Sequence, residues 1–155
     1  MKDLDQKFRR RGIVDKKIDR SNVLELKKVV KLYGWPDRRL VGVKGELAAW
    51  LIAQHADFDI KFQKSCLKYM TASIPSNSNN YKLIAYLTDR ILVNEGKRQL
   101  YGTQFHMSKD KLIPQPIKSI SLLDKRRQKY RLGQMDRYAT RLMRSFKKAQ
   151  ENRER

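Results

Sequence analysis

The stretch WLIAQHADFD, residues 50–59, is the one around which the rest of this chain is organised. It places His55, the only histidine in the middle of the chain, beside an amide and two carboxylates. Histidine often acts as a general base because its unperturbed pKa lies near neutrality, and Asp57, Asp59 or Asp89 can orient its ring. A histidine here can equally well end a buried helix, with its ring bonded to the backbone. The stretch therefore predicts either part of an active site or a helix end in the core.

The composition of the chain indicates one folded domain. The chain has 155 residues, of which 40% are hydrophobic, so it can bury a core and is not of a disordered class. A single cysteine, Cys66, cannot form an internal disulfide, which favours an intracellular, reducing compartment such as the cytoplasm or an organelle matrix. No apolar run is long enough for a transmembrane segment, and the first residues lack the apolar core of a secretory signal.

The net charge of +20 is concentrated at the two ends of the chain. Residues 1–39 carry 13 basic and 6 acidic side chains, residues 40–105 carry 8 and 5, and residues 106–155 carry 15 and 5. Such an excess repels itself unless a polyanion neutralises it. We therefore expect a basic N-terminal arm over residues 1–20, a helical domain over residues 21–140, and a basic helical extension over residues 141–155.

Hydrophobic periodicity predicts a mainly α fold, a compact bundle of about five to six helices with one small β-hairpin near residues 98–113. Ser21 is the expected N-cap of the first helix, and residues 40–45 are expected to be a connection. The helix over residues 46–56 is apolar enough to be buried on most sides. The other expected helices cover residues 60–74, 81–94, 119–131 and 134–149, with Asp57 or Asp59, and later Ser119, as N-caps.

Two later stretches are candidate partners for His55. YLTDR supplies Asp89, for which Arg127 is a possible ion-pair partner, and YGTQF combines a permissive glycine with hydrogen-bonding side chains. This second stretch suits a ligand pocket and a tight structural turn equally well. If the centre is an active site, His55, Asp89 and Gln104 are its candidate catalytic residues. The candidate pocket residues are Gln54, Asp57, Arg90, Tyr101, Gly102 and Thr103.

The sequence contains none of the common motifs that bind phosphate or metal ions or that mark a catalytic nucleophile. There is no phosphate-cradling glycine loop, no Cys-x-x-Cys pair, no nucleophile elbow and no zinc-protease signature. His55, Asp57 and Asp59 also lack the i, i+4 spacing of common zinc sites. We therefore expect neither a metal ion nor a cofactor.

Basic residues on helices carry the firmer functional signal. Lysine and arginine stripes neutralise phosphates, and Tyr130 and Tyr138 are candidates for stacking on the bases of unpaired RNA. This pattern favours nucleic acid as the partner, with RNA preferred over DNA. The candidate nucleic-acid contacts are Arg9, Arg10, Arg11, Lys16, Lys17, Lys27, Lys28, Lys31, Lys125, Arg126, Lys129, Arg131, Arg137, Arg141, Arg144 and Lys148.

Several motifs, taken together, resemble a known family. They are GWP (34–36), LVG (40–42), AAWLIAQHAD (48–57), AYLTDR (85–90), EGKRQLYGTQF (95–105), PQPI (114–117) and LDKRR (123–127).

In this order, these motifs resemble the pattern of a bacterial family of unknown function with QHAD, DR and YGTQ motifs, over residues 22–138. The resemblance implies a compact, mostly helical domain in which the candidate site residues gather. It implies no activity. This chain departs from the family pattern at Lys118-Ser119, where an acidic pair is usual, and at Arg131, where a glycine is usual.

Three functions follow as hypotheses. The first is an RNA-binding component of a large ribonucleoprotein particle such as a ribosome, in contact with other proteins of that particle. The second is a hydrolase or transferase with a pocket centred on His55. The third is a module that binds a membrane surface or another protein through the basic C-terminal helix.

Overall fold

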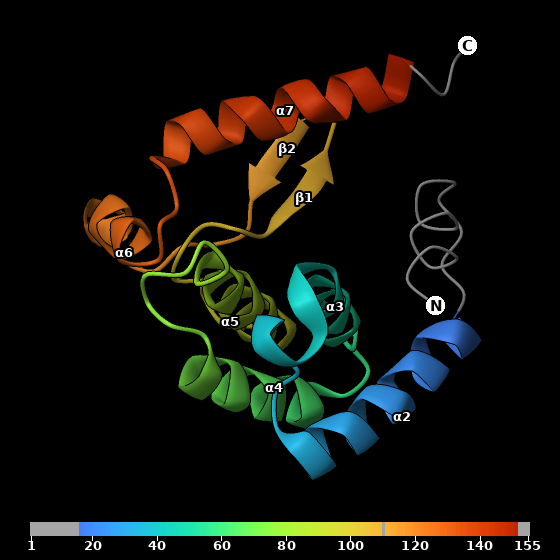
Figure 1. Ribbon diagram of the computed structural model, residues 1–155. Helices are drawn as coiled ribbons and strands as arrows, with labels where there is room; N and C mark the ends of the chain where they lie inside the picture. The colour runs from blue at the N-terminus through green and yellow to red at the C-terminus, as the bar shows by residue number, and fades with distance from the viewer. Residues whose placement is uncertain (1–15, 110, 152–155) are drawn as a thin grey trace. The chain divides into compact units, whose positions relative to one another are not determined.

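The computed structural model describes residues 16–109 and 111–151 (Figure 1). The chain forms two compact units, one up to Pro75 and one from Ser76. The described residues form six α-helices, one short 3₁₀ helix and one two-stranded antiparallel sheet. The predicted mainly α fold with a small hairpin is confirmed. Most of the predicted N-terminal arm, including Arg9, Arg10 and Arg11, lies outside the described residues. None of the described helices is both long and apolar enough to cross a membrane.

Unit 1 begins with α2, Lys16–Tyr33, which buries Val23, Leu26 and Val30 on one face. Ser21 lies inside this helix, so its predicted role as N-cap is wrong. Asp19 in the first turn favours an earlier start, because a carboxylate interacts well with the positive end of the helix dipole.

The second helix, α3 (Arg38–Gln54), begins earlier than predicted because Asp37 caps it. The Asp37 carboxylate accepts hydrogen bonds from the backbone N–H groups of Arg39 and Leu40, at 2.8 and 3.3 Å. Residues 40–45 are therefore helical and not a simple connection, although Gly42 breaks the helix with φ +69° and ψ 174°. Such a backbone is accessible to glycine and costly for other residues.

The burial predicted for residues 46–56 holds for all of them except Leu47, since the others are buried or half-buried. The buried residues of α3 are Glu46, Ala49, Ala53 and Gln54, whereas Leu47 is 37% exposed. Trp50, Leu51 and Ile52, the large apolar residues of this stretch, are half-buried. The helix ends at His55, whose backbone N–H donates to the Leu51 carbonyl at 3.1 Å.

The third helix, α4 (Ile60–Ser73), begins at Asp59, one of the two predicted caps. The Asp59 carboxylate accepts from the Phe62 backbone N–H at 2.9 Å and from Lys27 Nζ at 2.6 Å, which ties α2 to the start of α4. Phe62, Cys66 and Met70 form the buried stripe of this helix.

Unit 2 begins with α5, Lys82–Asn94, whose buried residues include Ile84, Leu87 and Ile91, as predicted. The chain leaves α5 through Gly96, at φ +70°, and continues into the hairpin of β1 (Phe105–Ser108) and β2 (Lys111–Pro114). The pairing is antiparallel, with His106 opposite Ile113.

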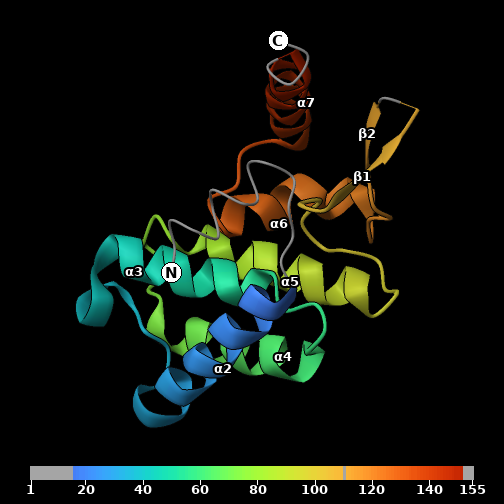
Figure 2. The same ribbon diagram turned by 90° about the vertical axis from the view of Figure 1, so that its right-hand side faces the viewer.

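The last elements are η1 (Ile120–Leu122), α6 (Leu123–Lys129) and α7 (Met135–Glu151). The hairpin and α7 lie on the same side of α5 (Figures 1 and 2). Ser119 occupies the N-cap position of η1, as predicted, but its backbone is left-handed and its side chain makes no capping hydrogen bond.

Candidate functional site

The carboxylate of Asp89 organises the loop that follows α5. Its Oδ1 accepts from the backbone N–H groups of Leu100 and Tyr101, at 2.7 and 3.0 Å. Its Oδ2 accepts from the backbone N–H and the hydroxyl of Thr103, at 3.0 and 2.9 Å. Asp89 is fully buried, so these donors replace the water that a carboxylate needs. Burial raises the pKa of the Asp89 carboxyl, and these hydrogen bonds act against that rise.

A buried arginine holds the carbonyl side of the same loop. Arg127 donates from its guanidinium to the carbonyl oxygens of Tyr101, at 2.5 Å, and Gly133, at 2.7 Å. It is fully buried, and this burial lowers its pKa, while the charge of Asp89 acts in the opposite direction. The predicted pair of Asp89 and Arg127 is thus linked through the loop: the carboxylate binds backbone N–H groups and the guanidinium binds a backbone carbonyl.

A third buried polar side chain, Gln99, joins the loop to the segment after the hairpin. Its Oε1 accepts from the Gln104 backbone N–H at 2.9 Å, and its Nε2 donates to the carbonyls of Gln104 and Gln115, at 3.0 and 2.7 Å. The Gln99 backbone pairs in addition with Pro116 and Lys118. Every polar group of this side chain is therefore satisfied inside the protein.

These contacts make YGTQ a tight structural turn, one of its two predicted roles. Tyr101, Gly102 and Thr103 are all buried. A Cβ atom on Gly102, which has φ +65°, would lie 2.9 Å from the Met135 sulfur. Gln104 remains half-buried and accepts from the Arg90 guanidinium at 3.4 Å. Asp89, Arg90 and residues 101–104 therefore gather in unit 2.

The candidate residues of unit 1 also lie close to one another. Gln63 is fully buried and donates from Nε2 to the carbonyls of Ala53 and Gln54 and to Asp57 Oδ1, at 3.1, 3.4 and 3.3 Å. It thus links the end of α3 to Asp57. His55 is half-buried at this helix end, in agreement with its alternative prediction as a helix terminus.

His55 belongs to unit 1, while Asp89 and Gln104 belong to unit 2. A catalytic triad of these three residues therefore stays a prediction. Among residues 16–109 and 111–151, no group of three His, Cys, Asp or Glu side chains could hold a metal ion.

The predicted nucleic-acid contacts whose side chains the structure describes divide into two groups. Lys27 is bound to Asp59, Lys28 to Glu25 at 2.8 Å, and Arg126 to the backbone carbonyls of Leu100, Lys118 and Ser119. Arg9, Arg10, Arg11 and the side chain of Lys16 lie outside what the structure describes. The side chains of the second group are exposed: Lys17, Lys31, Lys125, Lys129, Arg131, Arg137, Arg141, Arg144 and Lys148.

The two tyrosines predicted to stack on bases are engaged within unit 2. The ring of Tyr130 stacks on Tyr81, with centroids 4.9 Å apart and an interplanar angle of 6°. The ring of Tyr138 contacts the ring of Phe105, with centroids 5.8 Å apart. The Cζ atom of the Arg127 guanidinium lies 4.9 Å from the Tyr138 ring centroid. Both rings help to hold α6 and α7 in place, so base stacking on them is not favoured.

Sequence reasoning missed Gln99 and Gln63, two fully buried polar residues. Their partners are mostly backbone groups, which leave no pattern in the sequence. The one available signal for Gln99 was its place next to YGTQF, in a stretch rich in hydrogen-bonding side chains.

The fold and the site define a strongly basic, mainly α protein. In it, the buried carboxylate of Asp89 and the buried guanidinium of Arg127 fix the YGTQ turn, residues 101–104, which we call the central turn. The sequence matches the Family of unknown function (DUF6624) over residues 13–149. The chain therefore belongs to this family, and the predicted resemblance to a family of unknown function is confirmed. Comparison with curated proteins and with solved structures finds no match.

Proposed function

We propose that this protein binds nucleic acid, RNA in preference to DNA, as a component of a large ribonucleoprotein particle such as a ribosome. The observation that carries the proposal is the exposed basic surface of α6 and α7. Residues 123–151 contain ten basic and three acidic side chains. We call the exposed cations of this segment the α6–α7 surface: Lys125, Lys129, Arg131, Arg137, Arg141, Arg144, Lys147 and Lys148.

The arginines of residues 123–151 differ in their contacts, and this difference supports the proposal. Arg126 and Arg127 donate hydrogen bonds to backbone carbonyls at or next to the central turn, so these two arginines have a structural role. The cations of the α6–α7 surface lie outside that network, where they add to self-repulsion. Cations in such an arrangement gain free energy when phosphates replace their small counterions.

The enzymatic alternative has less support. A catalytic carboxylate needs an oxygen directed at the substrate, whereas both oxygens of Asp89 accept hydrogen bonds from the buried loop. A hydrolase or transferase centred on His55 would have to work without Asp89 as its base.

A filter-binding titration with RNA and DNA over a range of salt concentrations tests the proposal. We expect the logarithm of the binding constant to fall linearly with the logarithm of the salt concentration. In the double variant Arg141→Gln/Arg144→Gln, this fall should be less steep, with the magnitude of the slope reduced by about 1 to 2. Lys68→Gln, which removes an exposed cation from unit 1, is the control. Absence of binding at low salt would exclude the proposed function.

A further inference from the structure

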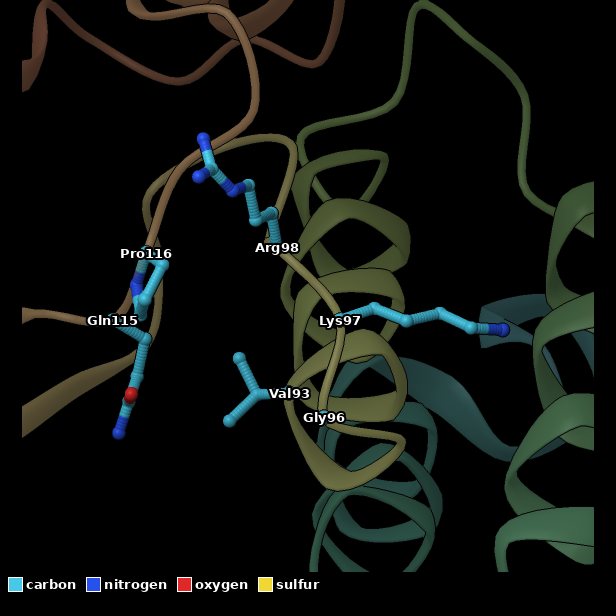
Figure 3. A pocket seen from close by; sticks show the side chains of 6 residues that line it. All are labelled: Val93, Gly96, Lys97, Arg98, Gln115 and Pro116. Carbon is cyan, nitrogen blue, oxygen red and sulfur yellow. The ribbon is translucent and has the colours of Figure 1, made fainter.

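A pocket of about 360 Å³ opens in unit 2 between the end of α5 and the segment after the hairpin (Figure 3). Its volume lies in the range of pockets that hold small ligands. Val93 points across the hollow toward Gln115 and Pro116, which form the opposite wall (Figure 3). The lining residues are Val93, Gly96, Lys97, Arg98, Gln115 and Pro116.

One wall of this pocket, formed by Gln115 and Pro116, is fixed by the buried network of the central turn. Gln99, next to Arg98, donates from its backbone N–H to the Pro116 carbonyl and from its side chain to the Gln115 carbonyl, at 2.9 and 2.7 Å. The Gln115 backbone N–H donates in turn to the Gln104 carbonyl at 2.9 Å. The wall formed by Gln115 and Pro116 is therefore held by a fully buried glutamine, and on that side a ligand would meet a preformed surface.

Two polar side chains of the pocket make no hydrogen bond to any residue that the structure describes. They are the guanidinium of Arg98, which is exposed, and the amide of Gln115, which is half-buried. The side chain of Lys97, by contrast, points away from Val93 and Gln115 (Figure 3), and its Nζ lies 3.1 Å from Glu95 Oε2. The pocket thus has a cation at its rim, where the Arg98 guanidinium points away from Val93 (Figure 3), an amide with both a donor and an acceptor, and apolar side chains on two sides.

This combination fits one chemical class. An arginine binds phosphate, an amide can pair with the edge of a nucleobase, and apolar side chains cover the faces of a planar ring. We propose that the pocket between Val93 and Pro116 binds a single nucleotide, with Arg98 on its phosphate and Gln115 on the edge of its base. In the context of the proposed function, on which this inference rests, that nucleotide is an unpaired one in RNA.

The test compares Arg98→Gln and Gln115→Leu with the wild-type chain in binding to single-stranded and to duplex RNA of equal length. Each variant should weaken single-strand binding by about tenfold, the usual effect of losing one good base or phosphate contact. Duplex binding, which depends on the α6–α7 surface, should change little. Lys68→Gln and Gln128→Leu, at exposed positions outside the pocket, are the matched controls, and circular dichroism verifies folding.

A second measurement separates the pocket from the proposed function. AMP and UMP are titrated into the wild-type protein while the methyl resonances of Val93 are followed by NMR. Shifts that Arg98→Gln abolishes would support the nucleotide site, even if the protein binds no RNA and the proposed function fails. Unchanged Val93 resonances, or wild-type single-strand affinity in both pocket variants when Arg141→Gln/Arg144→Gln loses binding, would overturn the nucleotide site and leave the proposed function standing.

Discussion

Asp89 joins α5 to the loop that follows it by accepting hydrogen bonds from Leu100, Tyr101 and Thr103. In Asp89→Asn, an NH₂ group would replace one oxygen and would face N–H donors of the loop. We expect this change to lower the free energy of unfolding by about 3 kcal/mol, because it leaves buried groups unpaired. Urea denaturation measures it. Asp124→Asn, at an exposed carboxylate that accepts from one backbone N–H, should cost far less. Equal stability of Asp89→Asn and the wild type would contradict this structural role.

The sequence could not predict the role of Asp89. It singled out YLTDR and YGTQF as candidate partners for His55, because unusual polar residues beside apolar ones are visible in a sequence, and the structure shows these two stretches bound to each other. The partners of Asp89 are backbone N–H groups, however, and every residue except proline has one. For the same reason, Arg126 and Arg127 look equivalent in LDKRR, although one is exposed in part and the other is fully buried.

Cys66 is a second residue whose environment sets its chemistry. Burial raises the pKa of its thiol to about 12, so at neutral pH the thiol is almost wholly protonated. Since the thiolate is the reactive form, iodoacetamide should modify Cys66 only when unit 1 opens. Mass spectrometry should show slow labelling of the native protein and rapid labelling in denaturant. Equally rapid labelling in both conditions would contradict the buried position.

At the level of elements, the start of α4 depends on a carboxylate with two functions. Hydrogen bonding to Lys27 is the main cause that lowers the pKa of Asp59, and the carboxylate also caps the helix. A lowered pKa in the folded state means that ionised Asp59 stabilises unit 1 above the unfolded value of about 4. This stability should be lost as the pH falls through the lower, folded value.

Two substitutions separate the functions of Asp59. Asn caps helices well, so Asp59→Asn removes the ion pair alone, whereas Asp59→Ala also removes the cap and should cost about 1 kcal/mol more. Urea denaturation at several pH values measures both. The stability difference between wild type and Asp59→Asn should shrink as the pH falls through the folded pKa of Asp59. A difference that does not depend on pH would show that the ion pair contributes nothing.

The break in α3 yields a further prediction. Gly42 has φ +69°, and a Cβ atom there would have no neighbour within 4 Å, so any cost of Gly42→Ala comes from the backbone alone. We expect that substitution to lower the free energy of unfolding by about 1 to 2 kcal/mol. Gly133 is equally open and has no left-handed φ, so Gly133→Ala is the control and should be close to neutral. Equal effects would contradict the conformation of Gly42.

Element types were easier to predict than element boundaries. Periodicity marked the helices, because the buried face repeats in the sequence. The starts of α2 and α3 were missed for different reasons. Ser21 resembles a cap but lies within a helix that begins earlier, and the Asp37 cap follows a proline turn that reads as a connection.

For the whole molecule, the net charge of +20 makes stability and binding respond to salt in opposite directions. In the free protein, added NaCl screens repulsion among cations such as those of the α6–α7 surface, so the Tm should rise between low and physiological ionic strength. Binding to RNA should weaken over the same range, because counterion release becomes less favourable. Differential scanning calorimetry and filter binding in the same buffers measure the two trends. A Tm that falls with salt would mean that attractive ion pairs such as Lys27–Asp59 outweigh the repulsion, and the basic surfaces would then need no polyanion to neutralise them.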